Sequence, residues 1–285
     1  MQLTPAYGAD PLMVIDGPPA AVLEPVVRQR RRLIGELEQL DDEQWAQPTR
    51  CEGWDARDVI VHLDSTNAFW SFSIAAGIAG TPTTFLSTFD PVASPAALVA
   101  ASDHPPAAVL DGFAASTEAL ATQLEALDEA DWSALAEAPP GHVTVSAVAH
   151  HALWDSWVHE RDILLPLGRA QVIEPDEVAA SLAYAAALSP AFAVSLGRGR
   201  TGVLGVAATA PSVQVAVEVD EVVRVRPGVA RDADLVLRGD AVDHTGRIEF
   251  APRQSARRRC LGGSERGGAA RQVGGRTWSS SGPGS

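Results

Sequence analysis

The 285-residue sequence contains no lysine, so all 22 of its basic residues are arginine, against 36 acidic residues and a formal net charge of -14. The absence of lysine, together with abundant alanine, glycine and proline, is typical of a very GC-rich coding sequence, and we interpret it as genomic bias. Because phosphate binding depends on clustered basic side chains, the acidic balance argues against a nucleic-acid partner. The basic cluster in residues 28–32 is explained by a solvated helix face.

Cysteine is also scarce, with Cys51 and Cys260 as the only two. Two cysteines are too few for a disulfide framework, and a zinc site of the CxxC type is excluded. The sequence lacks a glycine-rich phosphate loop and a GxSxG turn, and no Ser-His-Asp arrangement can be read from it. It therefore gives no support for phosphate-loop or serine-hydrolase chemistry.

Long apolar runs are missing as well. The longest uncharged stretches, residues 65–89 and 178–197, are interrupted by proline and rich in serine, threonine and alanine, unlike a membrane span. The first 20 residues have neither the basic start nor the apolar centre of a secretory signal. We therefore expect a soluble, cytoplasmic protein, monomeric or homodimeric, with no membrane partner.

Apolar residues that recur about every 3.6 positions predict four helices in the first part of the chain. They are expected over residues 24–40, 55–70, 107–127 and 143–165, with loops at 48–54 and 81–94. Helices of this length, joined by linkers of varied length, are typical of a helical bundle, where sites are built from facing side chains. Residues 1–20 are rich in proline and are expected to be an irregular extension.

After residue 166 the pattern changes. A helix is expected over residues 177–188, followed by short strands over 202–208, 213–219, 222–225 and 234–240 because of their β-branched content. Valines at 213, 215, 217 and 219 alternate with other residues and predict one buried face. The sequence thus predicts a mainly α protein, with a helical bundle at residues 21–168 and a small α+β domain at residues 169–251.

Residues 252–285 differ from both parts. They hold 7 Arg and 8 Gly with a single acid, Glu265, so their charge is near +6 while that of residues 1–251 is near -20. A segment with so little apolar periodicity cannot bury a core and is expected to be disordered. A basic arm that binds nucleic acid is one interpretation. We favour another, an out-of-frame translation, because GC-rich DNA read in the wrong frame yields Arg, Gly, Ser and Pro.

The most informative pattern is a carboxylate and an imidazole four positions apart, Asp155 and His159. On a helix this spacing stacks both side chains on one face. His62 lies on another expected helix, and if the two helices are neighbours the three side chains converge as two nitrogens and one oxygen. Three protein ligands with an open fourth position is how catalytic zinc is usually held. The spacing also suits a solvated pair and a hydrogen-bonded core histidine.

Two acidic residues lie at helical spacings from these histidines. Asp162 follows His159 by three positions, and Asp58 precedes His62 by four. Each is placed to orient an imidazole through its second nitrogen. A first-turn helix charge for Asp58 and a surface charge for Asp162 explain them equally well.

Further candidates surround the same two helices. His151 precedes Asp155 by four positions on the same face and is the alternative third ligand. Cys51, in a turn before Trp54, either approaches the site or is a buried structural thiol. Four tryptophans fall on or next to the two helices, and we expect most of them in the core and one or two in the wall of a substrate cleft.

Two stretches carry a family resemblance: TRCEGWDARDVIVHL at residues 49–63 and DSWVHERDI at residues 155–163. They resemble the mycothiol-dependent maleylpyruvate isomerase-like family of the DinB-like superfamily. In that family a Cys-x-Gly-Trp turn leads into a helix with a metal-binding His, and a later helix supplies an acidic residue and a His four apart. The resemblance covers roughly residues 20–250. It implies a DinB-like four-helix bundle with His62, Asp155 and His159 as metal ligands.

The resemblance also implies an activity. The expected cofactor is a divalent metal, zinc by expectation, and the expected cosubstrate is mycothiol, a cysteinyl sugar thiol. The reaction class is thiol transfer to, or thiol-assisted isomerisation of, a small electrophile, and the alternative is a non-catalytic ligand-binding or regulatory member of the same fold. The best-described isomerases carry Glu where this chain has Asp155, which either binds directly from a closer helix or acts through a water.

Overall fold

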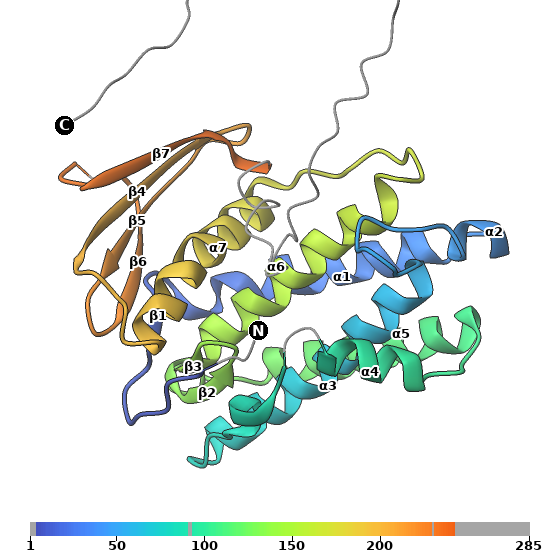
Figure 1. The fold of residues 1–285 in the computed structure, drawn as a ribbon, viewed down its shortest axis with the longest axis horizontal. Helices are drawn as coiled ribbons and strands as arrows, with labels where there is room; N and C mark the ends of the chain where they lie inside the picture. The colour runs from blue at the N-terminus through green and yellow to red at the C-terminus, as the bar shows by residue number, and fades with distance from the viewer. Residues whose placement is uncertain (1–3, 91–92, 230, 243–285) are drawn as a thin grey trace, which may run out of the picture. The chain divides into compact units, whose positions relative to one another are not determined.

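The computed structural model describes residues 4–90, 93–229 and 231–242 (Figure 1). Four long helices pack together as the predicted bundle. They are α1 (Leu23–Leu37), α3 (Ala56–Ile78), α5 (Pro106–Glu125) and α6 (Val145–Leu164). Each begins within a few residues of its predicted start, and α3 continues two turns past its predicted end. The mainly α fold with a small α+β part is confirmed.

Short elements connect the bundle helices. They are η1 (Pro19–Val22), α2 (Asp42–Trp45), η2 (Phe85–Thr88), α4 (Ala93–Ala101), η3 (Asp131–Ser133) and the hairpin of β2 (Leu135–Ala138) with β3 (Gly141–Thr144). The hairpin was not predicted from the sequence, which indicated only a connection between the third and fourth helices. Four-residue strands are too short to show alternation, so local pattern gave no signal for them.

The second part of the chain is a helix, α7 (Pro175–Ser195), beside a five-stranded sheet of order β1-β6-β5-β4-β7 (Figure 1). The strands are β1 (Met13–Ile15), β4 (Gly202–Thr209), β5 (Val213–Val219), β6 (Val223–Pro227) and β7 (Leu235–Asp240). β4, β5 and β6 form an antiparallel meander, and β1 and β7 pair in parallel at the edges. Val213, Val215 and Val217 are buried, as their alternation predicts.

The structure corrects the expectation that residues 1–20 are irregular, because β1 lies among them. Met13 pairs with Val223 of β6 and is fully buried. The pairing joins segments at opposite ends of the chain, and a three-residue strand has no periodicity of its own to reveal it. The predicted boundary between residues 168 and 169 stays a prediction. One hydrophobic core contains residues of the bundle, of α7 and of the sheet.

α7 is also longer than predicted and continues through Pro190. Among the described residues it is the one helix long and apolar enough to cross a membrane, and 56% of its apolar window is buried inside the fold. A core helix meets the same criteria of length and composition. The predicted tail at residues 252–285 lies outside the described residues.

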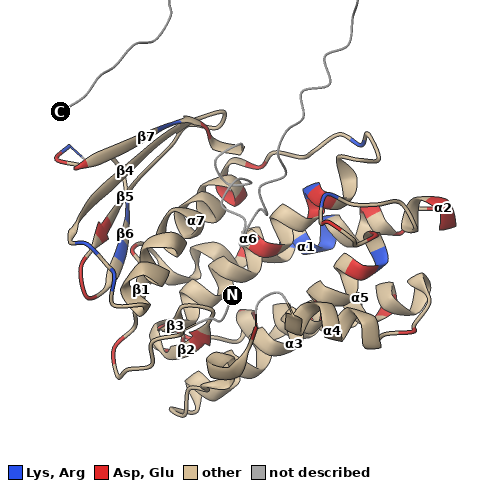
Figure 2. Ribbon diagram, in the orientation of Figure 1, with Lys and Arg blue, Asp and Glu red and all other residues tan. Residues whose placement is uncertain are grey.

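The arginines of α1 divide between solvent and the interior: Arg31 is exposed, as expected of a solvated face, but Arg30 and Arg32 are not. Arg30 is 2% exposed. Arg32 forms ion pairs with Glu160 of α6 at 2.9 Å and with Glu177 of α7 at 2.7 Å. Figure 2 marks the basic positions of α1 in blue and the acidic positions of the neighbouring helices in red. These acidic partners lie more than a hundred positions away, so the sequence around α1 could not show them. The pairs tie α1 to α6 and α7.

Candidate metal centre

The burial pattern of α6 singles out two of its residues. Every residue of this helix is buried except Asp155 and His159. The two lie four positions apart, so they share one face, one turn apart. A polar pair at the only open positions of an otherwise buried helix lines an access to the interior.

His62 of α3 faces this pair across the bundle. Its Nε2 lies 3.8 Å from Asp155 Oδ2, and His159 Nε2 lies 3.6 Å from Asp155 Oδ1. The two imidazole rings meet edge to face with centroids 5.2 Å apart. One nitrogen of each ring and one carboxylate oxygen lie within 4.8 Å of one another. The structure therefore brings together the three residues that the sequence predicts as ligands.

Burial and charge set the protonation of this cluster. Burial lowers the pKa of His62 to about 4, so its ring is neutral near pH 7. Burial acts to raise the pKa of Asp155, but the neighbouring His159 and the cation of Arg30 outweigh it and hold that pKa below its usual value. A neutral imidazole and an ionised carboxylate are the forms that ligate metals.

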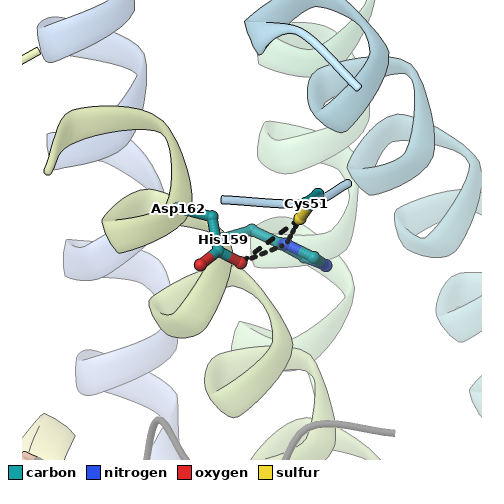
Figure 3. A group of neighbouring side chains, drawn as sticks. All are labelled: Cys51, His159 and Asp162. Atoms are coloured by element: carbon teal, nitrogen blue, oxygen red, sulfur yellow. Dashed lines mark hydrogen bonds and ion pairs between the residues drawn. The ribbon is translucent and has the colours of Figure 1, made fainter. Parts of the chain in front are cut away.

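The other nitrogen of His159 faces a second group. Its Nδ1 lies 3.2 Å from Asp162 Oδ2 and 3.5 Å from Cys51 Sγ, and Figure 3 shows the three side chains pointing toward one another. Burial opposes protonation of His159, but its contacts with Asp162, Cys51 and Asp155 outweigh it and raise its pKa well above 6.5. Metal binding at Nε2 is therefore expected to release a proton from His159.

The turn before α3 positions this second group. Gly53 has a φ of +82°, which glycine adopts without strain and which the Cys-x-Gly-Trp pattern provides. Asp55 caps α3 by accepting a hydrogen bond of 2.9 Å from the backbone N–H three residues later. The backbone N–H of Arg50 donates to the carbonyl of Asp162 at 3.0 Å, which fixes the turn against the end of α6.

The two other candidate residues, Asp58 and His151, lie outside the cluster of His62, Asp155 and His159. Asp58 accepts a hydrogen bond from Arg57 at 3.0 Å rather than contacting His62, as befits a charge in the first turn of α3. His151 shares a hydrogen bond of 2.5 Å with the hydroxyl of Tyr184, and burial lowers its pKa to about 4. In the described part of the chain, neither residue belongs to a group of donors close enough to share one metal ion.

The tryptophans divide between core and site, as expected. Trp54 packs against His62 with ring centroids 5.5 Å apart, so it forms part of the wall of the site. Trp70 and Trp154 pack against His151, at 4.5 and 5.6 Å. This aromatic cage explains why the His151 ring is inaccessible.

Arg30 is a site neighbour that sequence reasoning missed. Its Nε donates to Asn67 at 3.1 Å, while its Nη1 and Nη2 are buried with no hydrogen-bond partner in the described part of the chain. Its charge acts on both Asp155 and His151. An arginine in an arginine-rich helix carries no sequence signal that distinguishes it from its solvated neighbours.

The donor set suits a divalent metal. Asp155 Oδ2 is buried and receives no hydrogen bond within the described residues, which is costly for a carboxylate unless a cation compensates it. Two imidazole nitrogens and one carboxylate oxygen are ligands that zinc takes in catalytic sites. The side chains of His62, Asp155 and His159 are 15%, 13% and 16% exposed, so the cluster lies at the edge of the bundle interior rather than deep inside it.

Comparisons with known proteins agree with this fold. The family described as "Mycothiol maleylpyruvate isomerase N-terminal domain" matches residues 26–164. Two similar solved structures are those of a mycothiol-dependent maleylpyruvate isomerase and of its histidine-to-alanine mutant. Each has a TM-score of 0.56 and 16% identity, over 82% of this chain and 88% of the other. Among curated proteins, no sequence matches the chain. The matched residues hold the helical bundle and the side chains of His62, Asp155 and His159, so the similarity to this family covers the candidate metal centre.

Proposed function

We propose that this protein is a cytoplasmic, mycothiol-dependent metalloenzyme that catalyses thiol transfer to, or thiol-assisted isomerisation of, a small electrophile. The observation that carries the proposal is the convergence of His62, Asp155 and His159 within 4.8 Å around a buried carboxylate oxygen without a hydrogen-bond donor. The family match supplies mycothiol as the cosubstrate.

The chain's own residues prepare the site in three ways. Burial keeps His62 neutral, so that its lone pair is available near pH 7. Asp162 contacts Nδ1 of His159 at 3.2 Å and thereby directs Nε2 toward Asp155. Trp54 covers one side of His62 and limits the access of water. Together these contacts fix the donor atoms before a ligand arrives.

A divalent ion held by these residues would supply the acidity that keeps a thiol ionised near neutral pH. The protein would then need no nucleophilic cysteine of its own. The carboxylate of Asp155 would balance the charge of the ion, and neighbouring positive groups hold this carboxylate ionised. The partial exposure of His62, Asp155 and His159 is consistent with the approach of a small thiol from solvent.

The position of Asp155 favours direct binding of the metal ion by its carboxylate over binding through a bridging water. Its two oxygens already lie 3.6 and 3.8 Å from the histidine nitrogens that would share the ion. Such separations are close to those between ligands of one tetrahedral zinc ion, about 3.4 Å from the usual bond lengths. The shorter side chain is thus compensated by the position of α6.

Metal content tests the first half of the proposal. We expect about one zinc ion per purified chain, lost in His159→Ala, because three protein ligands are the usual minimum. His62→Ala should lose it as well when Cys51→Ser removes the thiol beside His159. His104→Ala is the matched control, since it removes an exposed histidine on a loop far along the chain from the cluster. A metal-free wild-type protein that zinc does not stabilise would contradict the proposal and favour the non-catalytic alternative.

Conjugation of mycothiol with monochlorobimane tests the second half. The wild-type protein is expected to accelerate the reaction, and a chelator, His62→Ala or His159→Ala to abolish the acceleration. Glutathione should react poorly, if the sugar part of mycothiol is recognised. Equal rates with both thiols that a chelator leaves unchanged would show that the protein does not activate the thiol.

A further inference from the structure

Cys51, His159 and Asp162 form a second cluster of metal-binding atoms, at the nitrogen of His159 that faces away from Asp155 (Figure 3). Cys51 Sγ lies 3.5 Å from His159 Nδ1 and 3.4 Å from Asp162 Oδ2, and these two atoms are 3.2 Å apart. A sulfur, a nitrogen and an oxygen thus form a compact triangle.

The three distances match the edge lengths of a tetrahedral zinc site. Bonds of about 2.3 Å to sulfur and about 2.0 to 2.1 Å to nitrogen and oxygen place such ligand atoms about 3.4 to 3.6 Å apart. Hydrogen bonds join the same atoms: the thiol donates to Asp162, and Nδ1 of His159 contacts both Asp162 and the sulfur. A cation in the middle would replace these weak contacts with three bonds from the same atoms.

The environment of the Asp162 carboxylate is a second indication that a cation binds here. Its side chain is 2% exposed, and its Oδ1 receives no hydrogen bond within the described residues. Its ion pair with Arg50 is long, at 3.7 Å, and the arginine side chain is 44% exposed. An exposed arginine at that distance compensates a buried carboxylate weakly. The imidazole of His159, 3.2 Å from Oδ2, is the nearer charged partner, and a divalent ion bound between them would compensate the carboxylate more strongly than a single proton.

The protein holds these donors in place without a ligand. The backbone hydrogen bond from Arg50 to the Asp162 carbonyl, at 3.0 Å, fixes the turn that carries Cys51 against the end of α6. Asp162 and His159 lie three positions apart on that helix and share a face. The cluster is therefore a preformed site that binds without rearranging the backbone.

We propose that Cys51, His159 Nδ1 and Asp162 form a second divalent-metal site, selective for thiophilic ions such as zinc, cobalt or cadmium because of its thiolate. A neutral imidazole has one free lone pair. An ion bound at Nδ1 therefore leaves Nε2 protonated. His159 can then no longer bind a metal ion together with His62 and Asp155. That competition rests on the proposed function, whereas the second site itself does not.

Cobalt titration of the metal-free protein, without any free thiol in solution, tests the site. A thiolate bound to cobalt gives a near-ultraviolet charge-transfer absorption that nitrogen and oxygen ligands do not give. We expect this band in the wild-type protein and its complete loss in Cys51→Ser. Cys260→Ser is the matched control and should keep the band, since it removes the only other thiol. His62→Ala should strengthen the band, because the competing set loses a ligand.

The outcomes separate the two proposals. If cobalt binds the wild-type protein and His62→Ala without the band, the second site does not exist and the proposed function is untouched. A band that survives in Cys51→Ser but disappears in Cys260→Ser also overturns the second site. If the wild-type protein shows the band but Cys51→Ser binds no cobalt at all, the second site holds and the proposed catalytic set fails.

Discussion

Two carboxylates with buried oxygen atoms have opposite hydrogen-bonding environments in this protein. Glu137, on β2, is completely buried and accepts four hydrogen bonds. Its donors, at 2.5 to 2.8 Å, are the hydroxyls of Tyr7 and Thr83 and the backbone N–H groups of Phe85 and Leu86. Asp155, on α6, has one oxygen without any donor in the described part of the chain and two histidines nearby.

The difference separates a structural carboxylate from the proposed metal ligand. Four donors fully satisfy Glu137, which thereby joins the N-terminal segment and η2 to the β2–β3 hairpin. Asp155 is surrounded by groups that hold its charge but do not occupy its lone pairs. A buried oxygen left free in this way is costly, and it is retained where a ligand completes it.

The largest predicted effect is on the structural carboxylate. Glu137→Gln puts an amide NH₂ against hydroxyl and N–H donors, so we expect the free energy of unfolding to fall by about 4 kcal/mol, from several charge-assisted hydrogen bonds. Asp155→Asn, the matched variant, should cost only about 1 kcal/mol in the metal-free protein, because it breaks no such set. Urea denaturation of the two metal-free variants measures both values.

Metal content completes this test. Folded Glu137→Gln should keep the wild-type zinc content, and Asp155→Asn should lose zinc affinity by about 10-fold or more. Equal losses of stability in the two variants would show that hydrogen-bond satisfaction does not separate the two carboxylates.

The sequence predicted one of these two roles and not the other. Asp155 and His159 belong to one helix, where a spacing of four fixes their geometry, and the family pattern supplied His62. Glu137 gave no signal, because its donors come from two segments, at residue 7 and at residues 83–86, that approach it only when the chain folds. Spacing along one element is readable from sequence, whereas contacts between distant elements are not.

The same reason explains the errors in the fold. The bundle helices and the alternating strand β5 follow local periodicity and were predicted. β1 was missed because its partner lies on β6, and Arg32 of α1 was placed in solvent because its acidic partners lie on α6 and α7. Cys51 was left open between site and core. The structure places it 3.5 Å from His159 and half-buried.

The second-largest predicted effect concerns His150, a buried histidine whose imidazole has a hydrogen-bond partner inside the fold. His150 contacts the Ser146 carbonyl through Nδ1 at 2.8 Å and faces a cavity of about 330 Å³ between α7 and the sheet. Burial lowers its pKa to about 4, although its hydrogen bond to Ser146 acts against the shift. In the unfolded chain the imidazole of His150 has a pKa near 6.5. Between about pH 4 and pH 6.5 it is therefore protonated in the unfolded chain but not in the folded protein.

This linkage makes stability fall with acid. The contribution of His150 is present above pH 6.5 and is lost as the pH falls toward 4, by about 3 kcal/mol in total. His150→Gln keeps a donor for Ser146 but does not titrate, so its free energy of unfolding should depend less steeply on pH over this range. Parallel slopes for the two proteins in urea denaturation at several pH values would refute the assignment.

The smallest predicted effect concerns the length of the ligand at position 155. Asp155→Glu restores the residue of the best-described isomerases but adds one methylene to a site where the present oxygens already lie 3.6 and 3.8 Å from the histidine nitrogens. If Asp155 binds directly, the longer side chain has to fold back, and zinc affinity should fall by less than about 10-fold, within the range of outer-shell changes. If it acts through a water, glutamate replaces the water and binds more tightly. Competition with a chromophoric chelator gives the sign, and tighter binding would contradict direct ligation by Asp155.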